Sequence, residues 1–139
     1  MAENATAKPD PIADPATREY WEGVARHELR LPRCLNCMEV HFYPRPVCPH
    51  CGETRFDWIR CSGIGEIYSF TVVRRAPSPA FESDVPYTVA VIALAEGPHM
   101  MSAVTGVDVN QVRVGQKVRV QFRDSTAGHT LPFFVLETG

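Results

Sequence analysis

Two CxxC pairs, Cys34–Cys37 and Cys48–Cys51, restrict the possible folds of this chain more than any other feature. Ten residues separate the pairs, so two tight turns can bring four thiolates around one metal ion at Zn–S distances of about 2.3 Å. Disulfide bonds are the alternative, but cytosolic thiols stay reduced and the first fifteen residues lack the apolar segment of a secretory signal. The pattern predicts a zinc ribbon over residues 34–60 with four cysteine ligands.

The metal also solves a stability problem for this segment. Residues 34–51 contain few large apolar side chains, whereas structural zinc contributes about 10–16 kcal/mol in comparable peptides. Iron is the competing metal, because two CxxC turns also build the one-iron site of rubredoxin-like proteins. Zinc is favoured because most of this chain lies outside the ribbon, unlike in a compact electron carrier. His41 and His50 are near in sequence, but four thiolates already complete the site.

The two turns differ at the residue that follows each pair. Gly52 follows the second pair and tolerates a positive φ, whereas Met38 stands at the equivalent place in the first turn. We therefore expect the first turn to be strained or differently shaped.

A short amphipathic helix is expected before the cysteines. Asp14 suits the N-cap and Pro15 the first helical position, and the pattern continues to about His27. Tyr20 and Trp21 lie on its apolar face. A helix of about three turns is unstable alone, so it must pack on this chain or on a partner. Residues 14–33 are assigned to this helix and a lead-in strand, and residues 1–13 to a disordered N-terminus.

The remainder of the chain, residues 61–139, has an all-β pattern. Five segments rich in β-branched and aromatic residues are predicted as strands: 66–74, 87–94, 99–105, 117–123 and 132–137. A short helical turn is expected at 108–112, between the third and fourth strands. This order is that of an OB-fold, a small barrel, and an unspecified five-stranded barrel is the alternative. The expected fold is mainly β, with an N-terminal helix, a four-cysteine zinc ribbon and a five-stranded OB-fold barrel.

Charge and missing motifs exclude several functions. The formal net charge is −2, whereas a nucleic-acid binder typically has a basic excess. The longest apolar run, residues 89–95, is far shorter than the ~20 residues of a membrane span, so we expect a cytoplasmic protein. Nucleophile-elbow, P-loop and dinucleotide motifs are missing, and a closed four-thiolate site has no open catalytic position. We predict no catalytic residues in this chain, and Cys61 as a buried packing residue rather than a nucleophile.

Several short motifs between residues 18 and 123 occur in a characteristic combination. They are Tyr20-Trp21-Glu22-Gly23, Leu29 to Arg33, Tyr43-Pro44-Arg45, Cys48 to Gly52, Trp58, Ser62 to Gly65, Tyr68 to Val73, Pro86-Tyr87, and Gly115 with Val118. Together they resemble the DUF35 family of zinc-ribbon plus OB-fold proteins, which are associated with acyl-CoA enzymes. The chain departs from the family pattern at His27 and Met38, where glycine is usual, and at Tyr43, where proline is common.

The resemblance implies a role as the small, non-catalytic subunit of a thiolase-like enzyme. Family members pair with thiolases, hydroxymethylglutaryl-CoA synthases, retro-aldolases of degradative β-oxidation, and acyltransferases. The catalytic partner would supply the reactive Cys and His, and this chain would stabilise it in a hetero-oligomer and help shape its acyl-CoA site. A nucleic-acid-binding zinc-ribbon/OB module is the alternative. Residues 60–139 carry equal numbers of acidic and basic residues, which does not favour the basic groove that single strands require.

Two loops of the expected barrel are candidates for contact with a partner or ligand. In OB-folds the loop between strands one and two and the loop between strands four and five lie together at the binding side. Here they are residues 75–86 and 124–131. Arg74 and Arg75, where the first loop begins, are candidates to contact the phosphates of coenzyme A, with solvated charges or salt-bridge partners as the alternative.

Overall fold

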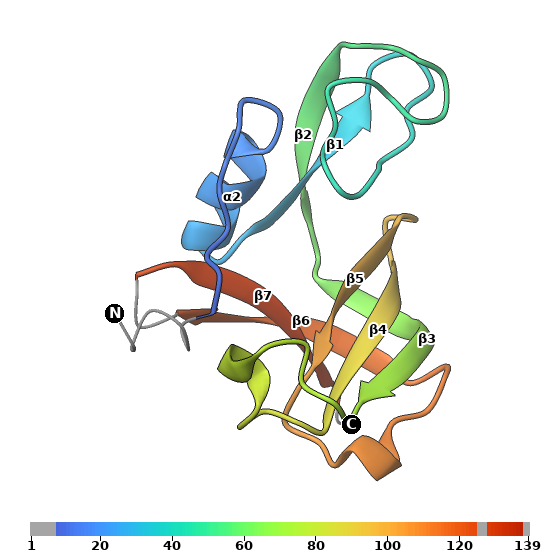
Figure 1. Cartoon of the computed structure of the whole chain (residues 1–139). Helices are drawn as coiled ribbons and strands as arrows, with labels where there is room; N and C mark the ends of the chain where they lie inside the picture. Colours follow the sequence, from blue (N-terminus) through green and yellow to red (C-terminus); the bar gives the residue numbers. More distant parts are fainter. Residues whose placement is uncertain (1–7, 125–127, 138–139) are drawn as a thin grey trace.

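The described part of the chain contains one helix, a two-stranded sheet and a five-stranded barrel (Figure 1). In this computed structural model the described residues are 8–124 and 128–137. The helix and strands are α2 (Arg18–Ala25), β1 (Leu29–Cys34), β2 (Phe56–Cys61), β3 (Ile64–Val73), β4 (Tyr87–Leu94), β5 (His99–Val104), β6 (Lys117–Asp124) and β7 (Thr130–Leu136). Two short 3₁₀ turns, η1 (Pro79–Phe81) and η2 (Val109–Gln111), lie in the barrel loops. The predicted fold class is confirmed.

The barrel closes in the order β3-β4-β5-β7-β6. All neighbouring strands are antiparallel except β5 and β7, which meet in parallel at Val104 and Phe134. The five predicted strands are all present, and η2 lies between the third and fourth of them as expected. Their ends differ from the prediction by at most two residues. Alternation of apolar and polar residues predicted these strands well because one face of each is buried in the barrel.

A glycine allows β3 to pair with both of its neighbours at the same point. Gly65 lies opposite Leu94 of β4 and Val118 of β6. A Cβ at this position would lie 2.6 Å from the Ile92 Cγ2 atom and 2.8 Å from the Ala93 carbonyl oxygen. Only a residue without a side chain permits this close approach, so glycine is required where the barrel closes.

The zinc ribbon extends from a two-stranded stalk, of which the sequence predicted only the first strand. A lead-in strand was expected before Cys34, and β1 confirms it. Its partner β2 was not predicted as a strand. The two strands pair antiparallel from Leu29 opposite Cys61 to Cys34 opposite Phe56. This register brings the start of β1, at Leu29, next to Cys61 and the start of the barrel at the base of the stalk.

The helix begins later and ends earlier than predicted. Asp14 does not cap it; its Oδ1 atom accepts hydrogen bonds from the backbone N–H and the hydroxyl of Thr17, at 2.9 and 3.0 Å, and so closes a preceding turn that contains Pro15. The helix starts at Arg18, with Thr17 at the N-cap position. Predicted disorder at residues 1–7 lies outside the described residues, and residues 8–13 form neither helix nor strand.

The helix ends in a Schellman turn rather than continuing to His27. The N–H of His27 donates to the Val24 carbonyl at 2.9 Å, and the N–H of Glu28 donates to the Gly23 carbonyl at 2.8 Å. His27 has a φ of 61°, the left-handed conformation that this motif requires of the residue after the cap. A histidine therefore occupies a position that usually favours glycine.

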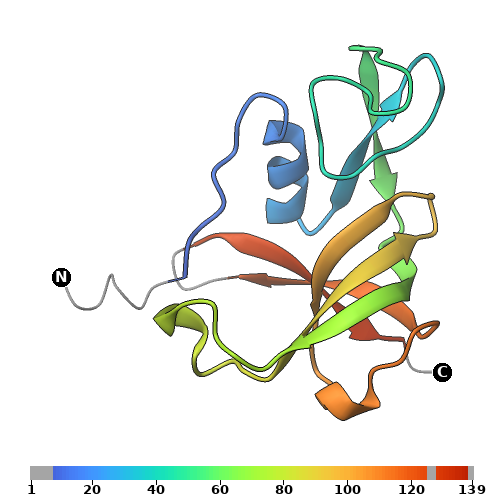
Figure 2. The same cartoon turned by 45° about the vertical axis from the view of Figure 1, so that its right-hand side comes forward.

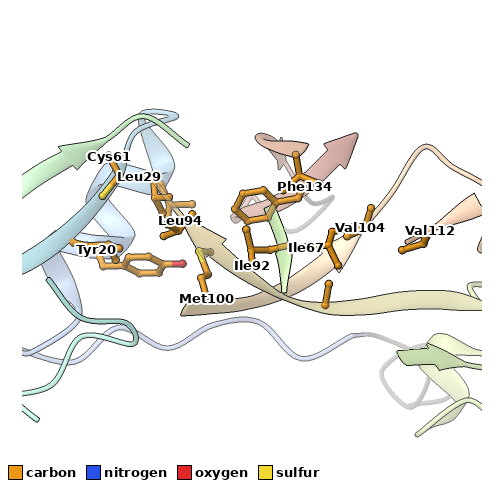
Figure 3. Packing of buried hydrophobic residues seen from close by; sticks show 14 residues of the cluster. Tyr20, Leu29, Cys61, Ile67, Ile92, Leu94, Met100, Val104, Val112 and Phe134 are labelled. Carbon is orange, nitrogen blue, oxygen red and sulfur yellow. The ribbon is translucent and has the colours of Figure 1, made fainter. Parts of the chain in front are cut away.

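One hydrophobic cluster joins the helix, the stalk and the barrel (Figure 3). Tyr20 and Val24 of α2 and Leu29 of β1 are at most 2% exposed. They continue through Leu94 and Met100 into the barrel interior around Ile67, Ile92, Val104 and Phe134 (Figure 3). The helix thus packs its apolar face on its own chain. Among the described residues, no helix is long and apolar enough to cross a membrane.

Candidate metal centre

The four predicted cysteines converge at the end of the stalk where Cys34 lies opposite Phe56. Their sulfur atoms all lie within 4.8 Å of one another. The Cys34 and Cys51 sulfurs are 3.5 Å apart, and the Cys37 and Cys48 sulfurs are 3.7 Å apart. A tetrahedron with Zn–S bonds of about 2.3 Å has edges of about 3.8 Å. The donor set and its spacing therefore fit zinc, and the predicted cluster of four cysteines is present and positioned to bind it.

Backbone and side-chain N–H groups donate hydrogen bonds to three of the four sulfur atoms. The Cys34 sulfur accepts from the N–H groups of Asn36 and Cys37 at 3.3 and 3.4 Å, and the Cys48 sulfur accepts from the His50 N–H at 3.4 Å. The Asn36 side-chain amide donates to the Cys51 sulfur at 3.5 Å. This hydrogen bond lowers the pKa of the Cys51 thiol to about 6, because hydrogen bonds to the thiolate stabilise the charged form.

The two turns that carry the cysteines have the same shape. The N–H of Met38 donates to the Cys34 carbonyl, and the N–H of Gly52 donates to the Cys48 carbonyl, both at 3.0 Å. Met38 has a φ of 66° and Gly52 a φ of 83°. The expectation that the first turn has a different shape is wrong. The expectation of strain is supported, because Met38 adopts the left-handed conformation, which is unfavourable for a residue with a side chain.

The neighbouring histidines have other roles, and the described cluster of ligands contains neither. His41 is 3% exposed, and its ring lies edge-on to Phe56 with centroids 5.4 Å apart. Its Nε2 atom accepts a hydrogen bond from the Arg45 N–H at 3.2 Å. Burial lowers the pKa of His41, so its neutral ring packs inside the ribbon and supports the loop before the second turn.

Cys61 lies at the base of the stalk, where the ribbon joins the barrel. The side chain is buried, with 5% of the residue exposed. Burial, reinforced by the neighbouring Glu96 carboxylate, raises the pKa of this thiol to about 12. A thiol that stays protonated at neutral pH is a poor nucleophile. This environment agrees with the expected packing role.

The structure leaves Arg74 and Arg75 exposed directly after β3. Within the described residues, neither forms an ion pair or a side-chain hydrogen bond. Of the second candidate loop, residues 125–127 lie outside the described residues.

Sequence reasoning missed a third arginine at this end of the barrel. Arg123 lines a cavity of about 400 Å³ together with Phe81, Tyr87 and Phe133. Strand alternation alone indicated that Arg119 and Arg123 share one face of β6. It did not indicate which of the two arginines faces a cavity.

Comparison with known proteins agrees with this architecture. Residues 21–57 match the family model described as "ChsH2, rubredoxin-like zinc ribbon domain", and residues 58–123 match "ChsH2, C-terminal OB-fold domain". The solved structure of the Ltp2-ChsH2(DUF35) aldolase is 30% identical, with a TM-score of 0.81 over 91% of this chain and 98% of the matched chain. Fold and site thus define a four-cysteine zinc ribbon joined to an OB-fold barrel.

Relatives with assigned names point to the same family. A DUF35 domain-containing scaffold protein of Pyrococcus furiosus is 35% identical over 75% of this chain and 76% of its own length. A probable enoyl-CoA hydratase alpha subunit of Thermomonospora curvata is 31% identical over 91% of this chain, which spans 39% of that relative's length. The chain belongs to the DUF35 family.

Removal of one ligand tests the metal site. We expect Cys51→Ser to lose zinc and to unfold residues 35–55, because the remaining three thiolates leave the coordination shell incomplete. Elemental analysis and amide hydrogen exchange measure the two effects. Cys61→Ser is the matched control, since it removes a thiol outside the cluster and should retain one zinc ion per chain. Soluble, folded wild-type protein containing neither zinc nor iron would falsify the site.

Replacement of Met38 tests the strain in the first turn. We expect Met38→Gly to stabilise the zinc-loaded protein by about 0.5–1 kcal/mol, because an L-residue in the left-handed region costs about 1–2 kcal/mol and glycine recovers part of it. Gly52→Ala, at the equivalent position, should destabilise by about 1 kcal/mol. Denaturant unfolding measures both. A less stable Met38→Gly protein would mean that packing of the methionine outweighs its backbone strain.

Proposed function

We propose that this chain is the non-catalytic zinc-ribbon/OB-fold subunit of a thiolase-like acyl-CoA enzyme complex. The complex would break or form C–C bonds in degradation of the β-oxidation type. The observation that carries the proposal is the similarity to the Ltp2-ChsH2(DUF35) aldolase, which extends over 98% of the matched chain. The names of other relatives support it: an enoyl-CoA hydratase alpha subunit, a 3-oxo-4,17-pregnadiene-20-carboxyl-CoA hydratase alpha subunit of Mycobacterium tuberculosis, and DUF35 scaffold proteins.

The chemistry of the cysteines favours a non-catalytic role for this chain. Four of them form the closed zinc site, which offers no open coordination position for a substrate. The fifth, Cys61, is held protonated by burial. The catalytic Cys and His would therefore belong to the partner. We place the complex in the cytoplasm, where the four thiols stay reduced and available to zinc.

Exposed apolar side chains at the tip of the ribbon favour contact with another protein. Leu35, Met38 and Val47 are large apolar residues around the metal site, and they are 47%, 54% and 47% exposed. Exposed apolar groups that gather on one surface are typical of interaction sites. Zinc coordination holds this tip in one conformation, so little conformational entropy is lost when a partner binds.

The other end of the chain would face the substrate. We propose that Arg74 and Arg75 contact the phosphates of coenzyme A at the interface with the partner. Their exposure and their lack of partners among the described residues leave both guanidinium groups available. A guanidinium binds a phosphate through two parallel hydrogen bonds.

Purification from the native host tests the assembly. We expect the chain to elute with a thiolase-like protein that carries the catalytic Cys and His, and the isolated chain to turn over no acyl-CoA. Cys61→Ser should leave the turnover of the assembled complex close to that of the wild type, because the reactive thiol lies in the partner. A large loss of turnover in a normally assembled Cys61→Ser complex would assign the nucleophile to this chain.

Charge reversal tests the two arginines. Arg74→Glu/Arg75→Glu should weaken acyl-CoA binding by the assembled complex roughly tenfold or more, because each lost charge-assisted contact is replaced by repulsion. Arg18→Glu/Arg26→Glu, at the first residue of α2 and at its C-cap, makes the same change in net charge at exposed positions and should leave the affinity unchanged. Equal affinities for the two variants would reassign Arg74 and Arg75 to bare surface or to the protein interface.

A further inference from the structure

A cavity on the outer face of the barrel, near the ends of its strands, has the volume of a small-molecule site. Its volume is about 400 Å³, within the range of about 300–1,000 Å³ typical of such sites. The loop between β3 and β4, which contains η1, forms one wall, and β5, β6 and β7 form another. Lys8 and Pro9 complete the rim. Figures 1 and 2 show η1 on the same side of the barrel as the end of the β6–β7 pair that lies below α2.

Aromatic side chains from three separate elements line this cavity. Phe81 comes from η1, Tyr87 from β4 and Phe133 from β7. The rings of Phe81 and Tyr87 are tilted by 35°, with centroids 6.2 Å apart. Leu131 adds an aliphatic contact. Aromatic faces bind heterocycles by stacking; the Lys8 ammonium lies over one face of Phe81, 5.5 Å from the ring centre, so a planar ligand would stack on the faces that the cations leave uncovered.

One cation in the cavity has no acidic partner in the described part of the chain. Arg123 donates from Nε to the Gln121 side chain at 3.1 Å and from NH2 to the Thr105 hydroxyl at 2.8 Å. Its guanidinium carbon lies 5.5 Å from the centre of the Phe133 ring. These neighbours hold the guanidinium in place without neutralising it. It keeps its full charge and has further N–H donors for a ligand.

The other charges at the site cancel. The Lys8 ammonium lies 2.6 Å from an Asp84 carboxylate oxygen. Farther along the same face of β6, Arg119 lies 3.8 Å from a Glu137 carboxylate oxygen. Arg123 thus gives the cavity one uncompensated positive charge beside its aromatic walls. The matching ligand carries a planar ring and an anionic group a few bonds away.

We propose that this cavity binds a nucleoside phosphate, with the base against Phe81, Tyr87 and Phe133 and a phosphate on Arg123. Two sources share this chemistry: the nucleotide end of coenzyme A and a free mononucleotide. Assignment to coenzyme A rests on the proposed function; the site itself does not. If coenzyme A is the source, Arg123 joins Arg74 and Arg75 at the same end of the barrel.

Calorimetry on the zinc-loaded full chain tests the site without any partner. Adenosine 3′,5′-bisphosphate should bind, and adenosine or inorganic phosphate alone should bind at least about tenfold more weakly, because each satisfies half of the site. Arg123→Gln should lower the affinity for the bisphosphate roughly tenfold. Arg119→Gln, on the same strand, is the matched control and should not change it.

Amide chemical-shift mapping keeps the test independent of any variant that folds poorly. Shifts induced by the bisphosphate should cluster at Phe81, Tyr87, Thr105 and Phe133. Coenzyme A binding as tightly as the bisphosphate, with adenosine 5′-monophosphate weaker, supports the site and assigns it to the coenzyme. Equal binding of the monophosphate supports the site and assigns it to free nucleotides.

Three results would overturn the proposal. They are absence of bisphosphate binding at millimolar concentration, an affinity unchanged by Arg123→Gln, and tighter binding of a single-stranded oligonucleotide than of any mononucleotide. The last would indicate a nucleic-acid groove instead. Failure here leaves co-purification with a catalytic partner unaffected, so the site and the proposed function fail separately.

Discussion

Coordination of one metal ion by four thiolates is the interaction on which the ribbon depends. Between β1 and β2 the chain runs for 21 residues, from 35 to 55, with no strand and few buried side chains. The cysteines hold this segment near both of its ends. Cys34 is the last residue of β1, and Cys51 lies shortly before the start of β2. The register of the stalk begins there, with Cys34 opposite Phe56. Zinc thus stabilises the loop and aligns the two strands that lead to the barrel.

The hydrophobic cluster connects the stalk of the ribbon to the barrel. Tyr20 and Leu29 lie beside Leu94 and Met100, and the cluster continues from there into the barrel core (Figure 3). A helix of eight residues is too short to persist alone, and burial of Tyr20 against β1 and the barrel supplies the missing stability. The helix, the stalk and the barrel are therefore parts of one packed body.

Strand β6 shows how one row of side chains acquires different roles. Arg119 and Arg123 project from the same face, four residues apart. Arg119 lies near the Glu137 carboxylate. Arg123 instead donates to the neutral side chains of Gln121 and Thr105 and lies over the Phe133 ring. An arginine paired with a carboxylate adds little beyond solubility at the surface. An arginine held without an acidic partner remains available to an anion.

The sequence by itself determined the four-cysteine cluster, the strands of the barrel and their order along the chain. These features depend on local spacing: two residues within each CxxC turn, and alternation along each strand. Strand β2 escaped prediction because its residues are only partly buried and its hydrogen bonds go to β1, 22 or more residues earlier in the chain. The helix began late because Asp14 bonds to Thr17 in a turn of its own. The unpaired charge of Arg123 was decided by tertiary structure alone. It depends on groups brought together by folding, namely Thr105, which follows β5, and Phe133 of β7.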